Sequence, residues 1–281
     1  MVTGEGTLAR IVRVWLPVGF FLVFALFPFY WMAITSIKPN SELYNRHLMP
    51  LLVHNPTLKH YIDLLTQTNF LQWTWNTMIV AVVSTAVSLL FGTMLAYPLA
   101  RMRFAGASLI AMTIAATYLV PQPLLFLPLA DIINRLNLGD TLTSVMLTYP
   151  TMLVPFCAWL LLGYFKTVPK ELEEAARIDG ATRLQTMRQV FLPLCVPGFI
   201  SAGIFAFTLS QNEFLYALIF LTKSEVRTVP IGVIAELIRG DVFYWGQLMA
   251  GALLGSIPVA LIYSFFVEHY VAGLTSGSVK A

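Results

Sequence analysis

Charged residues are scarce in this chain. Only 11% of the 281 residues are Asp, Glu, Lys or Arg, and 58% are hydrophobic, whereas an ordinary soluble domain carries about 25% charged residues. The net charge is only +3, and no Lys/Arg-rich run of the kind that binds nucleic acid is present. This composition excludes an ordinary soluble enzyme and indicates an integral membrane protein.

Residues that support catalysis or metal binding are also few. The two cysteines, Cys157 and Cys195, lie inside or at the edge of apolar runs, so they indicate no disulfide framework. The four histidines are scattered without ligand spacing, which argues against a metal site and against a membrane enzyme such as a lipid-linked sugar transferase. The chain contains no Gly-x-x-x-x-Gly-Lys-Ser/Thr phosphate loop, so we expect no ATPase site in it.

Long apolar runs dominate the sequence instead. A helix needs about 20 mostly apolar residues to cross a membrane. Six runs meet this length, and we expect an all-α membrane protein with spans at roughly 15–37, 76–100, 108–130, 141–163, 192–221 and 245–267. The first run is longer than the apolar part of a signal peptide and no small-x-small cleavage site follows it, so we expect it to be retained.

The distribution of basic residues indicates the orientation of the spans. With the N-terminus inside, ten of the 17 Lys and Arg residues fall on the inner side and seven on the outer side. Both termini and the loop at 164–191 are then cytoplasmic. The outer loops at 38–75 and 222–244 are the largest on their side. Within the first, the sequence LKHYIDLL has helical spacing, and Trp73 and Trp75 are expected in the interfacial aromatic belt.

The cytoplasmic loop predicts two short helices. Pro169 and the acidic residues after it favour the start of the first helix, and Gly180 favours its end in a left-handed conformation. Thr182 is expected to cap the second helix. Ala175 and Ala176 form a narrow side that fits a helix docking into a cleft. The residues alone support equally well an amphipathic helix that lies on lipid headgroups.

This loop resembles a motif of a known family. Glu174, Ala175, Ala176, Gly180, Val190, Leu192 and Pro193 match EAA-x3-G-x9-I-x-L-P with one departure, Val for Ile. The pattern is that of the cytoplasmic EAA loop of importer-type ABC transporter permeases. Four other stretches resemble the MalG-type permeases of carbohydrate importers: FPFYWMAITSIKP (27–39), YPLARMRFAG (97–106), NEFLYALIFL (212–221) and GLTSGSVK (273–280).

The resemblance implies a fold, partners and site residues. It implies a single domain over residues 1–281 with the type I ABC importer permease fold, in a bacterial inner membrane. A second related permease, an ABC ATPase dimer that binds ATP and Mg, an extracytoplasmic solute-binding protein and a sugar substrate would complete the importer. The residues expected to couple this chain to the ATPase are Glu174, Ala175, Ala176, Asp179 and Gly180, with Ser276 and Gly277 in the tail near the ATPase interface.

A polar cluster interrupts the fifth apolar run. Gln211, Asn212 and Glu213 offer donors and acceptors that suit sugar hydroxyls, and a carboxylate in a span normally faces a cavity or a partner. The cluster predicts part of the substrate pathway, although hydrogen bonding between helices or an interfacial position explains it too. Related permeases often carry Trp before the Asn-Glu pair, whereas this chain has Gln211.

Two alternatives remain open at this stage. The chain could serve an importer of another solute, such as glycerol phosphate, a polyamine or an amino acid. A channel or secondary transporter would explain the apolar spans but would leave the EAA-like loop without a role.

Overall fold

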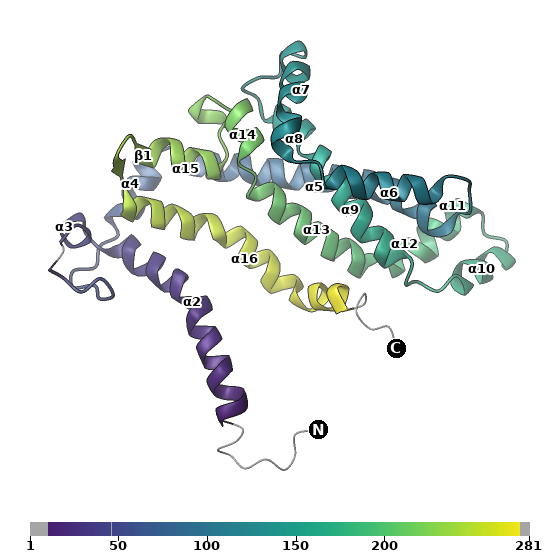
Figure 1. Ribbon diagram of the computed structural model, residues 1–281, viewed down its shortest axis with the longest axis horizontal. Helices are drawn as coiled ribbons and strands as arrows, with labels where there is room; N and C mark the ends of the chain where they lie inside the picture. Colours follow the sequence, from purple (N-terminus) through teal and green to yellow (C-terminus); the bar gives the residue numbers. More distant parts are fainter. Residues whose placement is uncertain (1–10, 46, 276–281) are drawn as a thin grey trace. The chain divides into compact units, whose positions relative to one another are not determined.

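The protein is almost entirely helical. The computed structural model describes residues 11–45 and 47–275 (Figure 1). The elements in chain order are η1 (Ile11–Trp15), α2 (Leu16–Ile37), α3 (Asn40–Leu43), α4 (Lys59–Gln67), α5 (Phe70–Arg101), α6 (Ala107–Tyr118), α7 (Gln122–Arg135), α8 (Leu142–Thr148), α9 (Pro150–Phe165), α10 (Glu171–Ile178), α11 (Arg183–Gln185), η2 (Thr186–Phe191), α12 (Leu192–Leu194), α13 (Val196–Gln211), α14 (Leu215–Phe220), η3 (Ser224–Val226), α15 (Val229–Leu237), β1 (Ile238–Arg239), β2 (Val242–Phe243) and α16 (Trp245–Thr275).

Several helices are long and apolar enough to cross a membrane. Four continuous helical stretches meet this condition within the described residues: Val12–Ile37, Phe70–Arg101, Leu142–Phe165 and Trp245–Phe266. Two bent pairs, α6 with α7 and α11–α12 with α13, raise the number to six if each pair is one span. The structure therefore supports four to six membrane spans.

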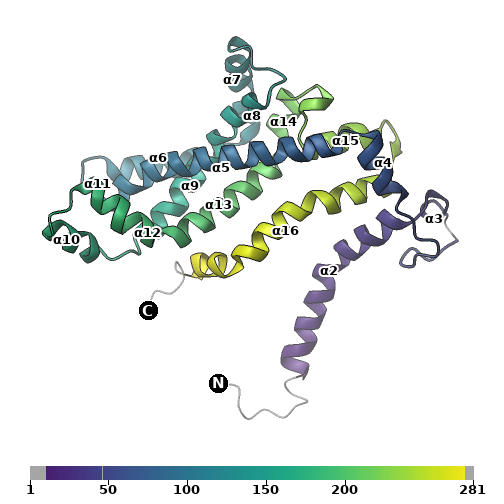
Figure 2. The same ribbon diagram turned by 180° about the vertical axis from the view of Figure 1, so that it is seen from behind.

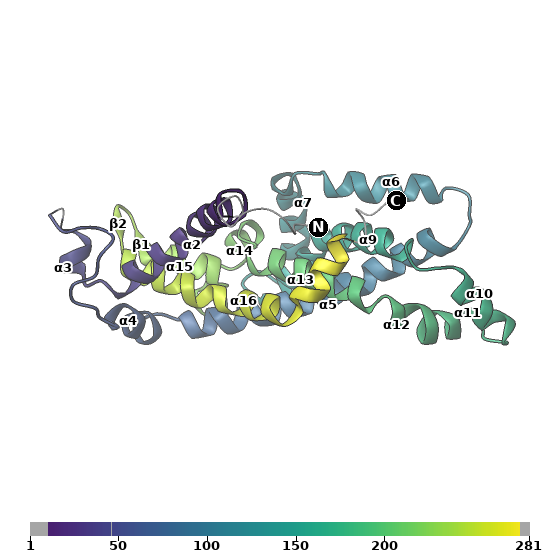
Figure 3. The same cartoon turned by 90° about the horizontal axis from the view of Figure 1, so that it is seen from below.

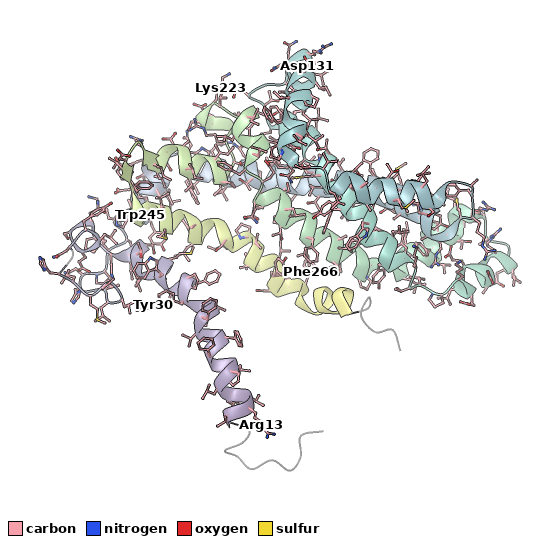
Figure 4. All side chains as sticks on the ribbon, viewed as in Figure 1. Arg13, Tyr30, Asp131, Lys223, Trp245 and Phe266 are labelled. Carbon is pink, nitrogen blue, oxygen red and sulfur yellow. The ribbon has the colours of Figure 1, made fainter. Side chains whose placement is uncertain are left out.

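The chain divides into two compact units, and one of them contains the first helix. It comprises the residues up to Phe70 together with Val233–Ile257. Most side chains of α2 are exposed between Arg13 and Tyr30 (Figure 4), and its buried residues cluster at the C-terminal end, at Ile34, Thr35 and Ser36. An apolar helix exposed in this way fits a lipid or protein environment rather than water.

Most of the segment at 38–75, expected as an outer loop, is folded in this unit. The expected helix in LKHYIDLL is confirmed as α4. Glu42 Oε1 accepts hydrogen bonds from the backbone N and Nδ2 of Asn55, at 2.7 and 2.9 Å, and Oε2 accepts one from the His54 backbone N at 3.1 Å. Burial opposes ionisation of Glu42, but these hydrogen bonds outweigh it and lower the pKa of the carboxyl.

The second unit comprises residues Leu71–Gly232 and the chain from Pro258 onward. Within it α9 contacts α6 and α13, and α5 runs along the same group of helices (Figure 2). One buried cluster includes Tyr149, Leu153 and Tyr216, and a second includes Phe165 and Phe191. Trp73 is fully buried here, and its Nε1 donates to the Ser224 carbonyl at 2.8 Å, so the expectation of an interfacial Trp73 was wrong.

The expected span at 108–130 is two helices rather than one. α6 ends at Tyr118, α7 begins at Gln122, and the pair is bent by 93°. Pro121 disfavours a helical conformation at the residue before it, and Pro123 occupies the first turn of α7, where a missing N–H costs nothing. The two prolines therefore account for a full break in this run.

The expected span at 192–221 is also interrupted. A bend of 69° separates Arg183–Leu194 from α13, which carries a proline in its first turn. α13 ends at Gln211, and a separate short helix, α14, begins at Leu215. The polar cluster of residues 211–213 therefore lies where the helix stops, not inside a continuous span.

Candidate functional site

The segment at 164–191, expected to be cytoplasmic, contains two short helices, α10 and α11. α10 carries Glu171, Glu173 and Glu174 in its first turn, where the helix dipole stabilises negative charge. Gly180 follows with φ +89°, so the expected left-handed stop is confirmed. The capping prediction for Thr182 is also confirmed, because Thr182 and Gln185 form a reciprocal capping box.

The side of α10 that carries the motif residues is accessible. Glu174, Ala175 and Asp179 are exposed, and Ala176 is half-buried. Of the expected coupling residues, Glu174 to Gly180 are thus brought together on one short helix and its C-terminal turn, which lie at one end of the second unit (Figure 3). Ser276 and Gly277 lie outside the described residues.

An ion pair joins this loop to the end of α5. Arg101 Nε lies 2.7 Å from Glu173 Oε1, and the two side chains are only 5% and 13% exposed. A cleft of about 370 Å³ beside the pair is lined by basic and acidic residues, including Arg103, Lys170 and Glu174. Sequence reasoning missed this pair. The sequence signal is the presence of Arg101 and Arg103 in the short connection between two expected spans, which contributed only to the predicted orientation of the chain.

The residues expected in the pathway occupy the break between α13 and α14. Glu213 is 6% exposed, and its carboxylate accepts hydrogen bonds from the backbone N of Tyr216 at 2.9 Å and of Ala217 at 3.2 Å. It therefore caps the N-terminus of α14. Gln211 is buried, whereas Asn212 is exposed and donates to the Thr208 carbonyl at 2.9 Å.

A cavity of about 420 Å³ adjoins this break. It lies between the end of α6, the start of α7, α9 and the end of α13, and its lining includes Tyr118, Gln122, Thr208, Asn212 and Phe214. Aromatic faces beside amide and hydroxyl groups are suited to binding a polar ligand with apolar faces. The broken helices thus bring together residues that the sequence placed in separate spans.

A carboxylate clasp fixes the loop after α14. Asp140 Oδ1 accepts hydrogen bonds from the backbone N of Thr222 at 2.6 Å and of Lys223 at 3.1 Å, and Oδ2 accepts one from Thr222 Oγ1 at 2.9 Å. The hydrogen bond from the Thr222 hydroxyl is the main reason that the pKa of Asp140 is lowered. On the other side of the loop, Asn76 Nδ2 donates to the Arg227 carbonyl at 2.9 Å.

We expect Asp140→Asn to loosen this loop by about 1 kcal/mol, because a neutral amide accepts these bonds less strongly and solvent screens the exposed site. A group with a lowered pKa stabilises the fold above its unfolded pKa, and this stabilisation is lost as pH falls through the folded value. The difference between wild type and variant should therefore be full at pH 7 and vanish well below the ordinary value of 3.8. Thermal unfolding in detergent from pH 7 down to about pH 2 measures it, and a constant difference at all pH values would contradict the assignment.

Comparison with known proteins decides what kind of chain carries these sites. A family model described as "Binding-protein-dependent transport system inner membrane component" matches residues 88–276. The chain belongs to this family. The matched region includes α10, Gly180 and the α13–α14 break, so both candidate sites are part of this permease.

Two similar proteins span nearly the whole permease. The sulfoquinovosyl glycerol transport system permease protein SmoH of Agrobacterium fabrum is 36% identical over 92% of this chain and 90% of its own. The trehalose/maltose transport system permease protein MalG of Thermococcus litoralis is 32% identical over 95% and 97%. A bacterial ABC transporter that imports the acidic polysaccharide alginate has the same fold, with a TM-score of 0.79 at 22% identity over 96% and 100% of the two chains.

Membership in this family settles the general role of the chain. It is a multi-pass protein of the inner membrane and a permease subunit of an ABC importer, and ATP hydrolysis belongs to a separate subunit. The expectation that this chain is not itself the ATPase is confirmed by the family, and a channel or secondary transporter is excluded.

Proposed function

We propose that this permease forms half of the translocation pathway for a sugar or oligosaccharide. One observation carries this proposal. Two relatives that span nearly the whole chain are named for sugar substrates: one for a sulfoquinovosyl glycerol and the other for the disaccharides trehalose and maltose. The cavity beside the α13–α14 break has suitable chemistry, with Tyr118 and Phe214 as aromatic walls and Gln122 and Asn212 as amides.

The proposed topology has six spans with both termini in the cytoplasm. In it, α6–α7 and α11–α13 each count as one bent span, and the charge bias orients the chain. The outer loops at 38–75 and 222–244 then face the binding protein, and the clasp at Asp140 holds part of the second loop in a fixed conformation. A bent span is acceptable in a membrane because neighbouring helices satisfy the freed backbone groups.

The proposed complex contains four kinds of protein chain. This permease pairs with a second related permease, two ABC ATPase subunits bind ATP and Mg, and an extracytoplasmic binding protein delivers the sugar. The family description, which specifies a binding-protein-dependent transport system, supports the last of these.

The proposed docking segment for the ATPase is Glu174–Gly180. Its support is the exposed Glu174 and Ala175, the narrow half-buried Ala176, and the fixed turn at Gly180. Closure of the ATPase dimer would displace α10 as a rigid element and move the attached spans with it. Ser276 and Gly277 remain proposed as a second contact with the ATPase.

We expect Asn212→Ala and Glu213→Gln to have different effects. Asn212 is exposed at the cavity and bonds only a carbonyl of its own helix, so its loss should raise the sugar concentration for half-maximal ATPase stimulation roughly 3- to 10-fold. Glu213→Gln replaces one accepting oxygen of the α14 cap by a donor and should lower the yield of assembled complex. Normal assembly of Glu213→Gln with altered sugar stimulation would instead place the carboxylate in the pathway.

A reconstituted complex tests the substrate class. With the cognate binding protein in proteoliposomes, saccharides should stimulate ATP hydrolysis and accumulate inside, while amino acids, polyamines and glycerol phosphate should do neither. Stimulation by one of these other solutes alone would overturn the assignment to sugars.

A further inference from the structure

We propose that Arg101 and Glu173 tie α5 to the coupling helix α10, so that α5 moves with α10 when the ATPase acts. The inference rests on the proposed docking of α10 and adds a third membrane helix to those driven by it. The chain itself already connects α10 to α9 before it and to α13 after it. α5 has no such covalent link, because residues 102–170 separate it from α10 in the sequence.

Arg101 is the last residue of α5 and contacts three parts of the loop at once. Its Nε pairs with Glu173 Oε1 at 2.7 Å, and its Nη2 donates to the Val168 carbonyl at 2.7 Å. Its guanidinium carbon lies 4.7 Å from the centre of the Phe191 ring. The planar guanidinium thus contacts the chain before α10, the first turn of α10 and the ring of Phe191 at the end of η2.

One helical turn earlier, Tyr97 strengthens the same attachment. Its hydroxyl donates to Glu173 Oε2 at 3.4 Å, and its ring packs against Phe191 with centroids 5.1 Å apart. Phe191 is fully buried and also contacts Phe165 at the end of α9, at 5.0 Å. We call Tyr97, Arg101, Val168, Glu173 and Phe191 the Arg101 cluster.

The two adjacent glutamates of α10 therefore have different environments. Glu173 is nearly buried against α5, whereas Glu174, the motif residue, is exposed. Consecutive helical residues point about 100° apart, so one helix can present Glu174 to a partner while Glu173 holds α5. A nearly buried ion pair also resists separation, because each charge left alone would be poorly solvated.

The consequence is mechanical rather than chemical. A displacement of α10 reaches α5 through the Arg101 cluster, and the membrane helices α5, α9 and α13 then shift together. Without the ion pair the ATPase still docks and hydrolyses ATP, but the end of α5 beyond its close contact with α9 at Gly92 lags behind α10, and less sugar crosses per ATP.

The test compares Arg101→Lys, Glu173→Gln and the exchange of Arg101→Glu with Glu173→Arg in the reconstituted complex. We expect the two single variants to keep the ATPase bound and to lower the amount of sugar transported per ATP by roughly 5-fold or more, the low end of measured couplings between sites. The exchanged pair should recover a substantial part of this ratio. Arg103→Gln and Glu171→Gln serve as matched controls, since both residues are exposed in the same connection and the same helical turn, and should transport as wild type.

A distance measurement distinguishes movement from mere stability. Spin labels at the exposed positions Met94 on α5 and Leu172 on α10 should keep one separation through the ATP cycle in wild type and acquire a nucleotide-dependent change in Glu173→Gln. A wild-type ratio of sugar to ATP in both single variants, or a label separation in Glu173→Gln that stays constant through the ATP cycle, would overturn the tie. Failure of the docking proposal is a separate outcome. In that case the Ala176→Trp complex would keep its ATPase bound and active.

Discussion

Ala176→Trp should release the ATPase and abolish transport, while the permease still inserts and folds. Ala176 lies half-buried on α10 beside the exposed Ala175, and the small side chains leave α10 narrow enough to enter a cleft. An indole is too large for a site shaped around a methyl group, so it should prevent α10 from entering the cleft of the ATPase. Copurification of the ATPase with tagged permease, followed by transport in proteoliposomes, measures both effects.

A tryptophan elsewhere in the same loop is the control. Leu184 is 61% exposed and lies beyond the Gly180 turn, so Leu184→Trp adds an indole outside the proposed docking segment and should retain the ATPase. Gly180→Val is a second, independent variant, because φ of +89° is strained for a β-branched residue. Full transport by Ala176→Trp with the ATPase bound would show that α10 is not the docking helix and would favour a helix lying on the lipid headgroups.

Gly92→Leu should prevent assembly of a stable permease. A β-carbon at Gly92 would lie 2.8 Å from Cys157 Cβ and 3.1 Å from the Ala158 backbone N, so α5 and α9 cross here at backbone contact. Small residues permit such crossings in membranes, where packing rather than hydrophobicity holds helices together. Separating the helices would also disturb Cys157 and the buried cluster around it, at a cost of about 3 kcal/mol or more.

The matched control is the same substitution at Gly163, in α9. A β-carbon there meets nothing within 4 Å among the described residues, so Gly163→Leu should leave the yield and the unfolding temperature nearly unchanged. Size-exclusion profiles and thermal unfolding of the detergent-solubilised proteins compare the two. Equal stability of Gly92→Leu and wild type would mean that α5 and α9 are not packed as described.

The helix ends in the segment at 164–191 were predictable from the sequence. Gly180 and Thr182 have one strongly preferred role at the ends of short helices, and the structure has them in these roles. Four of the six apolar runs also correspond to continuous helical stretches long enough to cross a membrane, whereas the other two are broken. The EAA-like spacing predicted the family, which the comparison confirmed.

Two of the features missed from the sequence depend on partners distant in the chain. Glu173 and Glu174 are adjacent glutamates. Only the fold reveals that Glu173, and not Glu174, forms the ion pair with Arg101, which lies 72 positions earlier in the chain. The sequence predicts an interfacial position for Trp73, but the fold brings the Ser224 carbonyl to its ring nitrogen. Glu213 interrupts an apolar run, but nothing in the run predicts that a helix ends there and that the carboxylate caps the next one.

The capping box after Gly180 stiffens the connection between α10 and α11. Only Asp179 to Thr182 separate α10 from α11, and their conformation is fixed by a helix stop on one side and by the Thr182–Gln185 bonds on the other. A connector with so few free torsions is stiff. In the proposed docking, a displacement of α10 would therefore pass to α11 with little bending of this connection.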